Sequence, residues 1–253
     1  MGKNRDGTMT MLEHFSELRR RLVWGVGAFL GAAIFAFSRV DLIRGILARP
    51  IGLINFIYIS PPEAFAANLR LSLIAAIVLA FPVLVYQGLA FLFPALYRQE
   101  KKIFLSALAG VCILFVSGSL FNYFVFVPSI WHFFLIFSGQ LEPYINISEY
   151  VTFICSLTLA FGLAFQMPVL FWILARMELI TARALQGQWR FALLVILFVS
   201  AMITPPDIFS QLLMAVPLSV LYGLAVFTVV LIEKKKNRKK TAGKIAEKRE
   251  MVA

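Results

Sequence analysis

Two acidic residues set among basic and aromatic side chains are the strongest candidates for chemistry in this sequence. Glu17 lies in the basic stretch 14–22, and Glu100 ends the stretch 91–100. Two carboxylates held close together can bind a guanidinium group through paired hydrogen bonds. Ordinary alternatives exist, because Glu17 lies four residues before Arg21 and could form a helical ion pair with it. Glu100 could likewise be a solvated surface charge.

Apolar helices must position these two acids. Hydrophobic residues make up 60% of the 253 positions and charged residues only 15%, whereas an ordinary soluble domain is about 25% charged. Each apolar run is continuous rather than alternating, which favours transmembrane helices. The runs cover residues 22–37, 75–93 or 64–93, 103–127, 151–175, 191–203 and 208–232. The predicted fold class is therefore all-α, a polytopic membrane protein with six transmembrane helices.

The distribution of basic residues predicts the orientation. Of the 24 Lys and Arg residues, 20 lie in the segments 1–21, 94–102, 176–190 and 233–253. These segments share one side of a six-span chain, and the positive-inside rule makes that side cytoplasmic. Both termini are therefore expected in the cytoplasm.

Three parts follow from this reading. We predict a cytoplasmic amphipathic N-terminus at 1–21, a six-helix transmembrane domain at 22–232 and a basic cytoplasmic tail of disordered type at 233–253. The net charge of +11 is concentrated at the span ends and in the tail, so anionic lipid is a better expected partner than nucleic acid. The fifth run would reach only roughly 20 Å across a core of roughly 30 Å.

Several polar residues lie at the ends of the spans or inside them. Glu63 and Asp207 follow Pro-Pro pairs, in the first helical turn, where the helix dipole favours an acid, so capping of the following helix would explain both. Gln166 lies inside the fourth run, where it would either bond to another helix or line a polar groove.

Sequence signatures of catalysis are missing. The chain has no phosphate-binding loop, zinc-protease motif or nucleophile elbow, and the six runs contain no carboxylate. Cys112 and Cys155 lie in apolar runs, while His14 and His132 have no metal-ligand spacing. We therefore expect no enzyme activity, cofactor or metal. A small-solute secondary transporter is the main alternative, although the inverted repeats that it would predict are not visible.

Three motifs occur in order along the chain. They are His14-x-x-Glu17-Leu18-Arg19-x-Arg21-Leu22, Phe91-x-x-Pro94-Ala95-Leu96-Tyr97-x-x-Glu100 and Thr204-Pro205-Pro206-Asp207-x-x-Ser210-Gln211, which runs into Pro217-Leu218-x-x-Leu221-Tyr222. With these motifs the chain resembles the TatC family, the core membrane subunit of the twin-arginine protein translocase, from residue 11 to about residue 235. The resemblance implies a six-helix receptor that recognises the Arg-Arg signal peptide of folded cargo on the cytoplasmic face.

This resemblance assigns roles to particular residues. Glu17 and Glu100 would bind the two arginines of the signal peptide. The residues that would shape the same site are Arg19, Arg21, Leu22, Phe91 and Tyr97. The resemblance also implies functional importance for Pro50 in the first outer loop and for Asp207 at the last outer turn.

Family resemblance further implies the partners TatB and TatA, a homo-oligomeric receptor complex in the cell inner membrane, and transport driven by the proton-motive force without nucleotide. Many members have Glu where this chain has Gln166 and Gly223. We therefore expect Gln166 to act as an intramembrane hydrogen-bonding contact and not as a titrating group.

Overall fold

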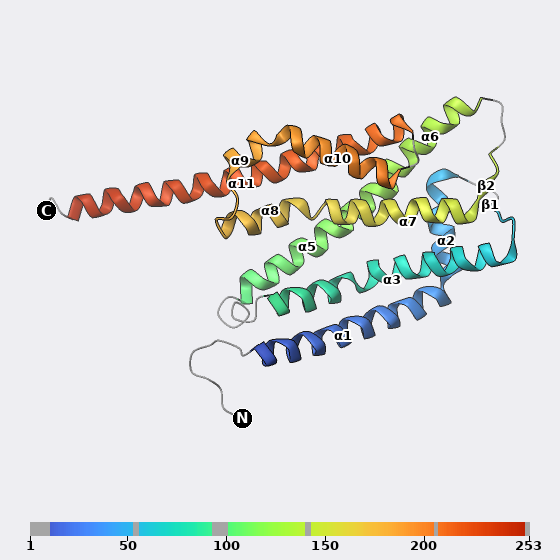
Figure 1. The fold of residues 1–253 in the computed structure, drawn as a ribbon, viewed down its shortest axis with the longest axis horizontal. Helices are drawn as coiled ribbons and strands as arrows, with labels where there is room; N and C mark the ends of the chain where they lie inside the picture. The colour runs from blue at the N-terminus through green and yellow to red at the C-terminus, as the bar shows by residue number, and fades with distance from the viewer. Residues whose placement is uncertain (1–10, 53–55, 93–100, 140–142, 205–206, 251–253) are drawn as a thin grey trace. The chain divides into compact units, whose positions relative to one another are not determined.

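The chain is almost entirely α-helical in the computed structural model (Figure 1). The structure describes residues 11–52, 56–92, 101–139, 143–204 and 207–250. The chain divides after Leu159 into two compact units, and the boundary falls within one helix, α7.

Long helices make up most of the first unit, together with a small cap formed by residues 40–51, 56–57 and 145–146. Helices α1 and α3 run side by side in Figure 1 and pack along each other. Two short strands pair in parallel, with Phe56 opposite Ile145. The elements in order are α1 (Met11–Ser38), α2 (Val40–Ala48), a 3₁₀ turn (Arg49–Ile51), β1 (Phe56–Ile57), α3 (Pro61–Leu92), α5 (Lys101–Phe121), a π-helical turn (Asn122–Phe126), α6 (Val127–Ser138), β2 (Ile145–Asn146) and α7 (Ile147–Ala164).

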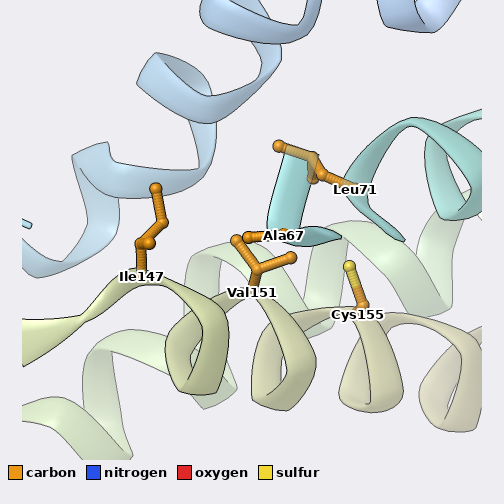
Figure 2. Packing of buried hydrophobic residues seen from close by; sticks show 5 residues of the cluster. All are labelled: Ala67, Leu71, Ile147, Val151 and Cys155. Atoms are coloured by element: carbon orange, nitrogen blue, oxygen red, sulfur yellow. The ribbon is translucent and has the colours of Figure 1, made fainter. Parts of the chain in front are cut away.

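A buried cluster joins α3 to α7 near the cap. Ala67 and Leu71 of α3 face Ile147, Val151 and Cys155 of α7 (Figure 2). Within each helix these residues are four positions apart, so they fall on one face. Partly buried side chains of α2 pack against the cluster and complete the cap.

Four helices form the second unit together with the end of α7. They are α8 (Met167–Arg176), α9 (Ala182–Gly187), α10 (Trp189–Ile203) and α11 (Ile208–Glu250). Helix α11 packs against α8, α9 and α10. Tyr222 of α11 makes an edge contact with the ring of Phe171, and its hydroxyl donates to the Leu185 carbonyl oxygen at 2.8 Å.

Five helical segments of the described chain are long and apolar enough to cross a membrane. They are Phe15–Ser38, Pro61–Phe91, Ala107–Ser138, Ile147–Arg176 and Ile208–Lys235. Helix α10 is apolar but has only 15 residues, which reach roughly 22 Å. The prediction of a polytopic all-α membrane protein with one short helix is thus confirmed.

Several predicted boundaries are wrong. The third helical segment does not end at 127 but continues to Ser138, through a π-helical turn placed just before Pro128. A wider turn there accommodates the missing N–H and the ring of proline. The fourth run is interrupted between Ala164 and Met167, because Pro168 has no N–H to donate to the Ala164 carbonyl and its ring crowds that carbonyl.

Both ends of the chain also differ from the expectation. Helix α1 runs from Met11 to Ser38 without a break at residue 21, since no proline interrupts it. Helix α11 continues through the basic segment to Glu250, where disorder was predicted. The Lys, Arg, Glu and Ala residues of this segment have high helix propensity, which accounts for the difference.

Candidate functional site

Glu17 lies on α1 and is ion-paired within its own helix. Its Oε1 accepts a hydrogen bond from Arg21 Nε at 2.8 Å, and its Oε2 lies 3.5 Å from Arg20 Nη2. The Glu17 side chain is 22% exposed and that of Arg21 is 19% exposed, whereas Arg20 points largely to solvent. The i,i+4 pair that the sequence offered as an alternative is therefore confirmed.

Arg21 also connects α1 to α3. Its Nη1 donates to Gln87 Oε1 at 3.4 Å. The sequence reasoning missed Gln87, although a usable signal was present, since it is the one amide side chain in the run 75–93. A polar side chain in an apolar helix usually has a specific partner.

A groove of about 350 Å³ begins beside this ion pair and runs between α1 and α3. Two glycines, Gly25 and Gly88, contribute no side chain to its wall, and a Cβ on Gly25 would meet Leu84 at 3.4 Å. The lining is apolar apart from Arg21 and Gln87. The residues around the groove are Leu18, Arg21, Leu22, Gly25, Val26, Phe29, Leu84, Gln87, Gly88 and Phe91.

Predicted site residues are partly brought together here. Arg21, Leu22 and Phe91 line the same groove, although Leu22 and Phe91 are 69 positions apart in the sequence. Arg19 is exposed and does not line it. Tyr97 and Glu100 lie outside the described residues. The described part of the site can therefore offer the Glu17 carboxylate, the Gln87 amide oxygen and the apolar groove to a ligand with a cationic end.

The two predicted outer residues fall in different units. Pro50 lies in the 3₁₀ turn that follows α2. Asp207 caps α11, because its Oδ1 accepts from the Ser210 amide at 2.6 Å. Its Oδ2 is buried and has no hydrogen-bond partner among the described residues. The capping expected from the sequence at Asp207 is confirmed.

Gln166 lies at the break between α7 and α8. Its Nε2 donates to the Gly162 carbonyl oxygen at 3.1 Å, one turn back in the same segment. Its Oε1 is buried without a partner in the described part of the chain. The bond that the structure describes is therefore local and does not join two helices.

No cluster of metal-ligating side chains stands out in the part of the chain that the structure describes. No group of three His, Cys, Asp or Glu residues in it could hold a metal ion. The polar groups that the described site offers to a ligand are therefore those of Glu17, Arg21 and Gln87.

Comparison with known proteins identifies the family. A family model described as "Sec-independent protein translocase protein (TatC)" matches residues 13–217. The chain is 35% identical to the Sec-independent protein translocase protein TatC of Carboxydothermus hydrogenoformans over 234 residues, which is 91% of this chain and 96% of that relative. It is 37% identical to the protein of the same name from Aquifex aeolicus, over 90% of this chain and 98% of that one.

Solved structures agree with these relatives. The fold is similar to that in the "Crystal Structure of Twin Arginine Translocase Receptor- TatC", with a TM-score of 0.76 and 32% sequence identity. The match covers 87% of this chain and 99% of the other. The groove that Arg21, the ion-pair partner of Glu17, helps to line thus belongs to a multi-pass membrane protein of the TatC family, a component of the twin-arginine protein translocase.

Proposed function

We propose that this translocase subunit recognises the Arg-Arg signal peptide of folded cargo at the rim of the α1–α3 groove. Glu17 and Glu100 are the carboxylates that bind the two guanidinium groups, and Arg19, Arg21, Leu22, Phe91 and Tyr97 shape the site. A guanidinium presents a planar fork of donors that matches a carboxylate, which explains why arginine is selected over lysine.

One observation carries this proposal, namely the position of the Glu17–Arg21–Gln87 group next to an apolar groove. A signal peptide has a basic start followed by roughly 7–15 apolar residues. A carboxylate at the rim and an apolar wall beyond it complement both parts in the right order. The apolar segment of the cargo would then lie against Leu22, Val26 and Phe91.

Orientation follows from charge. The segments rich in Lys and Arg support an orientation with both termini, Glu17 and Glu100 in the cytoplasm, where cargo is made. The membrane is the cell inner membrane, and the basic tail beyond 233 contacts anionic lipid. The subunit has no catalytic role, and the proton-motive force drives export.

Partner subunits complete the translocase. TatB and TatA act with this chain, and several copies form the receptor complex. The short helix α10 supports local thinning of the bilayer during export. Its 15 residues span only part of a hydrocarbon core that is roughly 30 Å thick, and thinning of the bilayer around the helix would relieve this mismatch. Pro50 and Asp207 support the outer face of this assembly.

Titration of a labelled twin-arginine peptide against the full-length chain in lipid nanodiscs tests the proposal. Glu17→Gln should weaken binding by roughly tenfold to hundredfold, because a charged acceptor is lost. Asp41→Asn is a matched control, since Asp41 also pairs with an arginine of its own helix, Arg44, but on α2. Unchanged affinity in Glu17→Gln would refute the assignment.

A further inference from the structure

Two adjacent arginines of this chain, Arg20 and Arg21, already form ion pairs with Glu17, the carboxylate that would bind the cargo. Arg21 Nε lies 2.8 Å from Glu17 Oε1, and Arg20 Nη2 lies 3.5 Å from Glu17 Oε2. An internal Arg-Arg pair therefore presents the same chemistry as the ligand. Arg21 Nη2 also lies 2.5 Å from Oε1, so Arg21 fills both lone pairs of that oxygen. A bidentate guanidinium from the cargo needs both carboxylate oxygens, so its binding must release Arg21.

Arg21 cannot simply move into water when it is released from Glu17. Its side chain is only 19% exposed, and a largely buried guanidinium without an acceptor is strongly disfavoured. Arg20 is 69% exposed and can return to water. Arg21 instead needs an acceptor that remains when Glu17 is taken, and Gln87 Oε1 on α3 already accepts from its Nη1 at 3.4 Å.

We propose that Gln87 is a positioning residue for signal-peptide binding, which holds Arg21 when the cargo takes the Glu17 carboxylate. This inference rests on the proposed function of Glu17. The neutral amide binds the guanidinium more weakly than the carboxylate does. Without cargo Arg21 bonds to both Glu17 and Gln87, and with cargo it keeps only Gln87, so the acceptor strength at residue 87 sets the affinity for twin-arginine peptides.

Two isosteric substitutions test this with opposite expected signs. Gln87→Met removes the acceptor and keeps the length, so the twin-arginine peptide should bind about threefold to tenfold more weakly to the full-length chain in nanodiscs. Gln87→Glu offers Arg21 a carboxylate and should tighten binding by a similar factor. The near-equal volumes of the three side chains keep the groove intact.

The Glu substitution also changes the net charge of the site, which could alter peptide affinity by itself. Repeating both substitutions in an Arg21→Gln background separates this charge effect from the effect on Arg21. The difference in affinity between Met and Glu at residue 87 should shrink by most of its size there, because no guanidinium remains for residue 87 to hold. If the full difference persisted without Arg21, or if Gln87→Met bound like the wild type, the inference would be wrong.

Failure of this inference is distinguishable from failure of the proposed function. Glu17→Gln is titrated in parallel. Weakened binding in Glu17→Gln together with equal affinities of the wild type, Gln87→Met and Gln87→Glu would overturn the role of Gln87 alone. Unchanged binding in Glu17→Gln would overturn both.

Discussion

Tyr150 on α7 anchors the short helix α2 through its hydroxyl, and removing that hydroxyl gives a sharply defined perturbation. The hydroxyl donates to the Leu47 carbonyl oxygen at 2.6 Å, while the ring packs 5.2 Å from that of Phe56 and is 8% exposed. Tyr150→Phe keeps the ring and its packing. Only the hydrogen bond to the C-terminal turn of α2 is lost.

Tyr123 provides a matched control. Its hydroxyl donates at 2.8 Å to the neighbouring Ile46 carbonyl oxygen, which also accepts from the Arg49 amide. Tyr123→Phe therefore leaves that carbonyl with a partner and should cost less than about 1 kcal/mol. Leaving the Leu47 carbonyl without its donor at a half-buried site should cost about 1–3 kcal/mol.

Hydrogen exchange measures this difference directly. Local opening of α2 exposes its amides, and about 1–3 kcal/mol corresponds to a roughly fivefold to hundredfold increase in their exchange rates. We expect this increase for residues 43–49 in Tyr150→Phe and a much smaller one in Tyr123→Phe. Unchanged exchange in Tyr150→Phe, or equal increases in both variants, would refute the reasoning.

Three further substitutions probe other parts of the fold. Leu71→Ala leaves a cavity in the cluster of Figure 2 and should lower the free energy of unfolding by about 2–5 kcal/mol, as measured by denaturant titration; a loss below 1 kcal/mol would contradict the packing. Gly52→Ala should cost about 1–3 kcal/mol in the same titration, because Gly52 has a φ of 91°; an unchanged midpoint would count against that conformation. Glu233→Ala should speed amide exchange across α9, since Glu233 accepts from the Ala182 amide at 2.9 Å; equal exchange would exclude a capping role.

Local patterns predicted much of the fold. Continuous apolar runs located every long helix, and the count of residues in the fifth run predicted a short one, because both properties depend on neighbouring residues alone. The end of the third helix was not predictable in this way. Pro128 normally argues for a boundary, and only the π-helical turn before it lets the helix continue.

Tertiary contacts explain why the site was predicted only in part. The pair of Glu17 with Arg21 is local and follows from helical spacing. The bond from Arg21 to Gln87 joins residues 66 positions apart, and no periodicity in the sequence aligns α1 with α3. The groove was missed for the same reason, since it exists only once Gly25 and Gly88 face one space.

Site-specific photo-crosslinking tests the central claim most directly. Val26 lines the groove, whereas Val23 lies on the same helix outside the groove lining and is also exposed, 64% against 47%. A photoreactive residue at position 26 should crosslink to a twin-arginine peptide, and most of this crosslinking should disappear when the two arginines of the peptide are changed to lysines. A photoreactive residue at position 23 should crosslink to neither peptide. Equal labelling from both positions, or equal labelling of the lysine peptide, would contradict recognition at this groove.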